Sequence, residues 1–190
     1  MPGLGVLALQ GDFAAHREAL AALGLAAVEV RRCRQIDGLS GLVMPGGEST
    51  TLLNLMGDEP WFDALRAFHR RGGAILGTCA GAILLSREVR GRAQPCLGLL
   101  DAVIERNAYG RQVDSFEVTI EAPALGDGLR AVFIRAPRFV ALGPEVEVLA
   151  CHGQEPVLVR QGRVLAATFH PEIAADSRLH RLFADLASRP

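Results

Sequence analysis

The sequence predicts an α/β fold, a doubly wound domain with a mainly parallel central sheet, helices on both faces and antiparallel strands in the C-terminal half. Three observations lead to this prediction. Apolar runs of strand length alternate with helical segments in the first half. Strand-like runs separated by short turns fill most of the second half. The 190 residues suffice for one well-packed domain, so we expect residues 1–190 to form a single domain.

The first half contains four short apolar runs that we expect to be parallel strands, because strands covered on both faces carry continuous apolar residues. A helix is expected after the first run, with Asp12 as its N-cap and Gly24 at its end. Another helix follows Pro60, and a third begins after Cys79. The expected strands are 5–9, 26–30, 41–44 and 74–77, and the helix after Pro60 covers 61–73.

The second half has strand-like segments with short connections. Gln161-Gly162 has the pattern of a hairpin turn between two strands. The segment 174–188 is amphipathic and is expected to be a closing helix, because its apolar residues recur at helical spacing. The expected strands are 115–120, 131–137, 145–150 and 156–169, the last including the hairpin.

Composition excludes several classes of protein. Hydrophobic residues make up 49% of the chain and aromatic residues only 5%, so the core must be mainly aliphatic. The net charge of −1 and the scattered arginines form no basic stripe, so we expect no nucleic-acid partner. The N-terminal "MPGLGVLALQ" has no charged flank, and its apolar run is too short for a secretory signal or a membrane span. We therefore expect a cytoplasmic protein without a membrane partner.

The cysteines do not form a metal-binding or disulfide pattern. The four are widely spaced and include no C-x-x-C pair, which favours a reducing compartment and argues against a structural zinc site. Cys151 and His152 are adjacent, and neighbouring residues of a strand point to opposite faces. We expect no metal and no cofactor.

The segment "GTCAGA" (77–82) follows an apolar strand and precedes a helix. It matches the G-x-nucleophile-x-G elbow with Cys79 in place of serine, and its glycines permit a sharp turn with close strand and helix backbones. A helix N-terminus beneath the sulfur favours the reactive thiolate. The alternative is that Cys79 is a small buried hydrophobic residue. The motif alone leaves both interpretations open.

The segment "FHPEI" (169–173) contains a candidate base and its orienting group. His170 can take a proton from Cys79 and later deliver it to a departing amine, while Glu172 holds the other ring nitrogen. A helix start, with Pro171 at the first position, is the alternative. A zinc deaminase is excluded, because the H-x-E pattern lacks the P-C-x-x-C that must follow it.

The segment "PGGEST" (45–50) places two glycines after the third expected strand. Its backbone N–H groups, with the N–H of Ala80, are suited to a developing oxyanion. The alternative is an ordinary glycine-rich turn followed by a helix capped by serine or threonine. It is not a phosphate-binding P-loop, because no G-K-[ST] follows.

Two arginines also attract attention. Arg106 lies in the polar segment "ERNAYGRQVDSFE" (105–117), which on its own is also consistent with a solvated loop. Arg135 lies inside the apolar "FIRAP", where a strand arginine needs an anionic partner. That partner is either a substrate carboxylate or a structural acid, and the residues do not decide between them.

Taken together, the motifs resemble the triad-type (class I) glutamine amidotransferases, and within them the glutaminase subunits of pyridoxal 5′-phosphate synthases. The resemblance covers essentially the whole chain, and "PGGESTT" with "RNAYGRQVDSFE" is specific to the subfamily. The motifs that carry it, in order, are "GVLALQGDFAAH", "LVMPGGESTT", "GTCAGAILL", "RNAYGRQVDSFE", "FIRAP" and "ATFHPE".

The resemblance implies hydrolysis of L-glutamine at Cys79 through a glutamyl thioester, with His170 and Glu172 completing a triad. It implies that ammonia passes to a separate synthase subunit that makes pyridoxal phosphate. Chemistry also favours a partner, because the chain has no room for an acceptor domain and free ammonia would be lost to water. Gln10 is expected to lie near that partner or near the oxyanion turn. The implied glutamine contacts are Gly47, Glu48, Ser49, Arg106, Ile134 and Arg135, with Gly47 and Ala80 as the oxyanion donors.

Three other functions are kept as alternatives. A hydrolase or redox-stress protein with the same elbow would not need glutamine, a partner or Glu172. A catalytically silent binding module would only shape the synthase. A glutaminase serving a different synthase, such as one for histidine or purines, would share the same triad. We also hypothesise that docking orders the oxyanion turn through backbone flips at Gly46 or Gly47.

Overall fold

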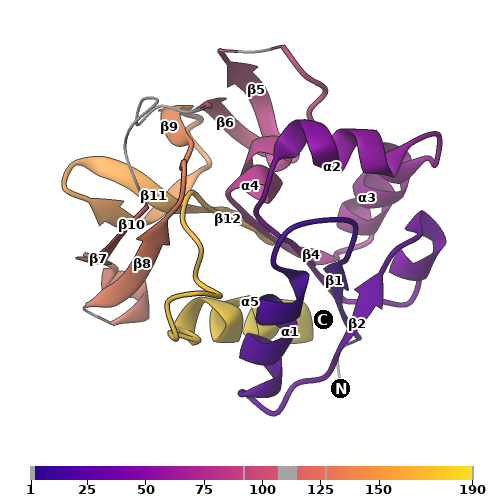
Figure 1. Ribbon diagram of the computed structural model, residues 1–190, viewed down its shortest axis with the longest axis horizontal. Coiled ribbons are helices and arrows are strands. Elements are labelled where there is room, and N and C mark those ends of the chain that lie inside the picture. The colour runs from indigo at the N-terminus through magenta and orange to yellow at the C-terminus, as the bar shows by residue number, and fades with distance from the viewer. Residues whose placement is uncertain (1–2, 92, 107–114, 127, 190) are drawn as a thin grey trace.

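The computed structural model describes residues 3–91, 93–106, 115–126 and 128–189. Within them, a seven-stranded sheet with the order β10-β11-β12-β4-β3-β1-β2 forms the centre of the molecule (Figure 1). The strands from β12 to β2 in this order are parallel, whereas β10, β11 and β12 pair antiparallel. Their bounds are β1 Leu4–Leu7, β2 Ala27–Val30, β3 Gly41–Met44, β4 Ala74–Thr78, β10 Glu147–His152, β11 Glu155–Gln161 and β12 Val164–Ala167.

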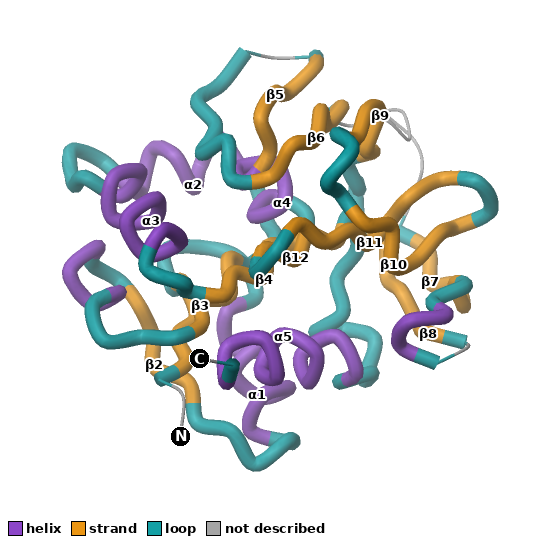
Figure 2. Tube along the Cα trace, turned by 180° about the vertical axis from the view of Figure 1, so that it is seen from behind, coloured by secondary structure: helices purple, strands orange, loops and turns teal. Residues whose placement is uncertain are grey.

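Helices cover both faces of this sheet. Figures 1 and 2 show α1 and α5 on one face and α2, α3 and α4 on the other. None of the helices in the described part of the chain has the length and apolarity needed to cross a membrane. Their bounds are α1 Phe13–Ala21, α2 Ser49–Met56, α3 Trp61–Arg70, α4 Ala80–Leu85 and α5 Arg178–Ser188, with short 3-10 turns η1 Cys33–Ile36 and η2 Pro123–Leu125.

Each face of the sheet has its own hydrophobic core. Val43 of β3 packs with Leu20 of α1 and Phe183 of α5. The preceding residue, Leu42, belongs instead to the core that contains Leu65 of α3. Successive strand residues point to opposite faces, so a continuous apolar strand supplies both cores. The predicted fold class, with helices on both faces and antiparallel strands in the C-terminal half, is confirmed.

Two small sheets lie beside the main one, with the orders β5-β6-β9 and β7-β8. The sequence pattern predicts β7 and β8 in part, but it does not indicate β5, β6 or β9. β5 has the polar sequence SREVR and follows α4 without a connecting loop, so neither composition nor a turn marks its start. The bounds are β5 Ser86–Arg90, β6 Leu100–Glu105, β7 Phe116–Ile120, β8 Leu129–Phe133 and β9 Arg138–Leu142.

The closing helix begins later than predicted. It was expected over 174–188, but α5 begins at Arg178. Ala175 has a positive φ of 51°, which is incompatible with a right-handed helix. The side chain of Asp176 then accepts a hydrogen bond from the backbone N–H of Arg178 at 3.1 Å. The local hydrogen bond thus offers the backbone an alternative to an earlier helical turn.

Candidate active site

The sheet order brings the singled-out loops to one edge. The loops that follow β1, β3, β4 and β12 carry Gln10, the glycine turn, Cys79 and His170, respectively. These four strands are neighbours and parallel, so their carboxyl ends lie side by side. Ligands of open α/β sheets bind at this end of the strands. Segments far apart in the sequence therefore meet at one place.

Cys79 stands on a strained turn between β4 and α4. Its φ of 47° is positive, which is unusual for a residue other than glycine. The flanking glycines allow this turn, because a Cβ on Gly77 would lie 2.7 Å from the backbone carbon of Gly81. A Cβ on Gly81 would lie 2.1 Å from the carbonyl oxygen of Met44. Cys79 is buried, but ordinary core packing does not require a strained backbone, so the geometry favours the nucleophile elbow.

His170 and Glu172 form the second part of the site. His170 Nδ1 lies 2.8 Å from Glu172 Oε1, and the Glu172 side chain is fully buried. The backbone N–H of His170 donates to the carbonyl of Val132 at the end of β8, at 2.8 Å. Residues 171–175 form turns, so the helix start considered for this segment is wrong. The turn lets the side chains of His170 and Glu172 face each other, whereas a helix start would direct them to different sides.

The electrostatics of His170 depend on these neighbours. Burial disfavours its charged form, but hydrogen bonds and charge interactions with Cys79 and Glu172 outweigh burial and raise the pKa of His170 to about 10. The imidazole is thus held as an imidazolium between a sulfur and a carboxylate. An imidazolium in this place can deliver a proton to a leaving group.

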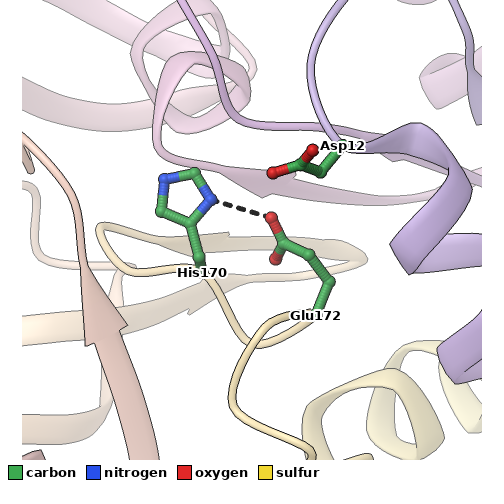
Figure 3. A group of neighbouring side chains, drawn as sticks. All are labelled: Asp12, His170 and Glu172. Atoms are coloured by element: carbon green, nitrogen blue, oxygen red, sulfur yellow. Dashed lines mark hydrogen bonds and ion pairs between the residues drawn. The ribbon is translucent and has the colours of Figure 1, made fainter. Parts of the chain in front are cut away.

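Asp12 lies across from this pair, as Figure 3 shows. Within the described ranges, Asp12, His170 and Glu172 are the one group of three His, Cys, Asp or Glu residues close enough to share a metal ion, with ligand atoms within 4.8 Å of one another. Cys151 and His152 belong to no such group. Nδ1 of His170 already bonds Glu172, so Nε2 is the ring nitrogen left for other groups.

The glycine turn after β3 lies directly against the proposed nucleophile and base. A Cβ on Gly46 would lie 2.3 Å from Cε1 of His170 and 3.2 Å from Cβ of Cys79. Gln10 holds this turn, because its Nε2 donates to the Gly46 carbonyl and its Oε1 accepts from the Glu48 N–H, both at 3.2 Å. Gly47 has a φ of 126°, a conformation that favours glycine. The structure therefore places Gln10 at the turn, one of its two expected locations.

Two of the predicted glutamine-contact residues bind one amide, and a third pairs with one of these two. Gln94 Oε1 accepts from Arg106 at 2.8 Å and from the Ser49 hydroxyl at 2.9 Å. Arg106 also pairs with Glu48 at 2.7 Å. Arg106 therefore finds its anionic partner within the protein. Gln94 was not singled out from the sequence, because a lone amide in "GRAQPCLG" carries no local pattern.

Glu48 also caps the helix that follows. It is the N-cap of α2, and its carboxylate accepts from the Thr51 N–H at 2.7 Å. The sequence alternative, a glycine-rich turn followed by a helix with a serine or threonine cap, is correct about the helix. The capping residue, however, is Glu48. Partial burial opposes the charge, but hydrogen bonds from Thr50, Thr51 and Arg106 lower the pKa of Glu48 to about 2. Glu48 is therefore ionised at neutral pH.

Arg135 differs from its prediction. β8 ends at Phe133, and Arg135 lies in the following turn with a positive φ of 45°. It is exposed, so water can solvate its guanidinium and it needs no buried acid. The prediction that Arg135 lies in a strand is therefore wrong. Within the described part of the chain, no side-chain hydrogen bond or ion pair connects Ile134 or Arg135 with Cys79, and residues 107–114 lie outside that part.

Comparison with known proteins agrees with the geometry. Residues 6–188 match the model of the SNO glutamine amidotransferase family. The chain is 55% identical over 186 residues to the pyridoxal 5′-phosphate synthase subunit PdxT of Thermus thermophilus, with 97% of each chain covered. It is 51% identical over 189 residues to the subunit of the same name from Deinococcus radiodurans, with 97% of this chain and 96% of the relative covered.

Solved structures give the same picture. A crystal structure described as a glutamine amidotransferase superposes with a TM-score of 0.92 at 53% identity and covers 98% of this chain and 99% of its own. The PurLQS structure from Thermotoga maritima superposes with a TM-score of 0.74 at 15% identity, covering 97% of this chain and 99% of its own. The second likeness shows the fold alone.

Proposed function

Because the chain belongs to the SNO glutamine amidotransferase family, we propose that it hydrolyses L-glutamine to L-glutamate and ammonia and supplies the ammonia to a pyridoxal 5′-phosphate synthase. One observation carries the proposal. Cys79 has a strained backbone at the end of β4, and the His170–Glu172 pair lies at the same edge of the sheet. Residues 1–190 act as one glutaminase domain in this proposal. Its four unpaired cysteines fit a reducing cytoplasm.

The first half-reaction forms a thioester. The Cys79 sulfur attacks the side-chain amide carbon of glutamine, and the amide oxygen becomes an oxyanion facing the N–H groups of Gly47 and Ala80. Ala80 begins α4, so its N–H has no acceptor within the helix. His170 gives its proton to the amide nitrogen, the C–N bond breaks, and ammonia leaves a γ-glutamyl thioester on Cys79.

The second half-reaction restores the enzyme. Neutral His170 takes a proton from water, the hydroxide attacks the thioester carbon, and the sulfur leaves as glutamate is released. Glu172 keeps the ring in one orientation throughout, because its Oε1 bonds Nδ1 and leaves Nε2 for the reacting groups.

Glutamine also needs partners for its charged ends. We assign its contacts to the backbone and side chains of the glycine turn and to the two arginines, whose charges suit a zwitterionic amino acid. Glu48 is ionised and exposed enough to meet an ammonium group, while Arg106 is fixed by Gln94. The contacts in this assignment are Gly47, Glu48, Ser49, Arg106, Ile134 and Arg135.

The test is glutamate release from glutamine, measured for the chain alone and with a pyridoxal 5′-phosphate synthase subunit added. Cys79→Ala, checked for folding by circular dichroism, is the matched control. We expect release that the synthase subunit increases and that Cys79→Ala abolishes. Activity independent of the subunit would point to another synthase. The absence of any Cys79-dependent glutamate would contradict the proposal and return Cys79 to a packing role.

A further inference from the structure

A cluster of buried polar side chains lies beside Glu172, next to the carboxylate oxygen that does not bond His170. His16 comes from α1, Thr78 from β4 and His180 from α5. His16 Nδ1 lies 2.9 Å from His180 Nε2, and His16 Nε2 lies 3.2 Å from the Thr78 hydroxyl. The same Nε2 lies 3.3 Å from Glu172 Oε2. All of these side chains are fully buried or nearly so, so water does not satisfy them.

Glu172 needs a second partner that the triad does not supply. Its Oε1 is bonded to His170, but Oε2 is buried without a well-aligned hydrogen-bond donor in the described part of the chain. A buried carboxylate oxygen without compensation is costly. The ring nitrogen of His16 is the group within ion-pair distance of Oε2. His16 is therefore placed to compensate the oxygen that faces away from His170.

The contact between the two histidines selects the tautomer of His16. One proton lies between His16 Nδ1 and His180 Nε2. If His16 carried that proton, its Nε2 would turn a lone pair toward the negative oxygen of Glu172. If His180 carries it, His16 is protonated at Nε2, and the N–H dipole faces Glu172 and Thr78. Electrostatics favours the second arrangement.

Both histidines are held neutral by their surroundings. Burial lowers the pKa of His16 well below its usual value, and the charges of His180 and His170 lower it further. Burial also lowers the pKa of His180 to about 4, although Asp176 opposes this effect. A neutral His16 can turn its N–H dipole toward Glu172 without competing with His170 as the site of protonation.

We propose that His16 is a positioning residue for the reaction: held by His180 as the Nε2–H tautomer, it fixes the inner oxygen of Glu172 and so keeps the carboxylate aligned with His170. The inference rests on the proposed function of the triad. Glu172 is then held at both oxygens. His170 contacts Oε1, and His16, which does not touch the substrate or the sulfur, contacts Oε2. α1 and α5 thereby contribute to a site formed by strand-end loops.

The first experiment compares His16→Leu with His16→Gln in the complex with the synthase subunit. The glutamine side-chain nitrogen can occupy the place of imidazole Nε2, whereas leucine offers no donor. We expect His16→Leu to lower kcat/KM for glutamate release about tenfold to a hundredfold, as for a lost hydrogen bond to a charged group. KM should change little, and His16→Gln should restore most of the activity.

A pH profile separates positioning from packing. Without His16 the carboxylate stabilises the imidazolium of His170 less, so the alkaline limb of kcat/KM should move to lower pH in His16→Leu and not in His16→Gln. Equal impairment of both variants with an unmoved limb would mean a packing role and overturn the inference. Unchanged activity of His16→Leu would overturn it too. A parent chain without Cys79-dependent glutamate would instead overturn the proposed function, and the inference with it.

A second measurement determines the tautomer in the parent chain itself. Nitrogen-15 spectra of the histidine rings in the parent chain report which nitrogen of each carries the proton. We expect the Nε2–H tautomer for His16 at neutral pH, with assignment from the loss of its signals in His16→Gln. The Nδ1–H tautomer, or a charged ring, would overturn the inference.

Discussion

Gly46 is the residue through which the glycine turn touches both proposed catalytic side chains. An added methyl group would fall 2.3 Å from a carbon of the His170 ring, which cannot withdraw because Glu172 holds it. We expect Gly46→Ala to lower glutaminase activity by at least about a hundredfold, as a displacement of order 1 Å does at a reacting centre. Activity is measured with the synthase subunit present, and stability by urea unfolding.

Gly24→Ala is the matched control for Gly46→Ala. Gly24 lies at the end of the first helix, has a φ of 75°, and has open space around the position of a Cβ. Its substitution should cost about 1 kcal/mol of stability and leave the activity of the folded protein unchanged. Full activity of Gly46→Ala would show that the turn does not pack against the reacting groups in solution.

At the same scale, the sequence predicted the residues that carry local patterns. Cys79 has an elbow motif, and His170 with Glu172 has a short H-x-E motif, so each was singled out as a candidate without a structure. Gln94, His16 and His180 were missed, because their roles arise from contacts across 12 to 164 positions of the chain. A single amide or histidine has no periodicity that signals such a partner.

The elbow as an element depends on how closely α4 approaches β3. Gly81 faces the Met44 carbonyl, and a Cβ there would lie 2.1 Å from that oxygen. The obstacle is backbone, which moves less readily than a side chain. We expect Gly81→Ala to lower the free energy of unfolding by about 3 kcal/mol or more, as severe overpacking does. Gly98→Ala, with a φ of 66° and no neighbour within 4 Å, should cost only about 1 kcal/mol. Equal losses in urea unfolding would contradict this account of the elbow.

The contact between α1 and α5 makes stability depend on pH. Burial lowers the pKa of His180 in the fold to about 4, below its unfolded value near 6.5. Between these two values the unfolded chain binds more protons, so the contribution of His180 is complete above about pH 6.5 and is lost as the pH falls toward 4. The loss amounts to at most about 3 kcal/mol.

Thermal unfolding between pH 7 and pH 4 tests this expectation. His180→Gln keeps an N–H donor toward His16 but does not titrate, so its melting temperature should fall less over this range than that of the parent chain. Groups that do not contact His180 titrate equally in both proteins and cancel in the comparison. Identical pH dependence of the two melting temperatures would show that His180 is not held neutral in the fold.

Elements were predictable where burial dominated. β3 was predicted with its observed bounds, and β4 within one residue, because both are buried throughout and end at glycine-rich turns. β5 and β9 are partly exposed and mix charged with apolar residues, so their pairing in the small sheet is set by tertiary contacts. The start of α5 was misplaced because the hydrogen bond of Asp176 competes with helix formation.

At the scale of the whole molecule, the strand order explains why the candidate site residues lie at one edge of the sheet. The loops after β1, β3, β4 and β12 meet only because β12, from the end of the chain, pairs beside β4. The chain therefore completes its site with its last strand, and His170 arrives from the far end of the sequence. That pairing was not predictable from the separate motifs, although the fold class was.

The central claim is that Cys79 is the nucleophile. Its most direct test is intact-mass analysis of the protein, quenched in acid while it turns over glutamine with the synthase subunit present. We predict a species heavier by one glutamyl group, located at Cys79 by peptide mapping and removed by hydroxylamine. It should be absent in Cys79→Ala and should accumulate more slowly in His170→Asn. Glutamate release without any such adduct, or an adduct on another residue, would contradict the account.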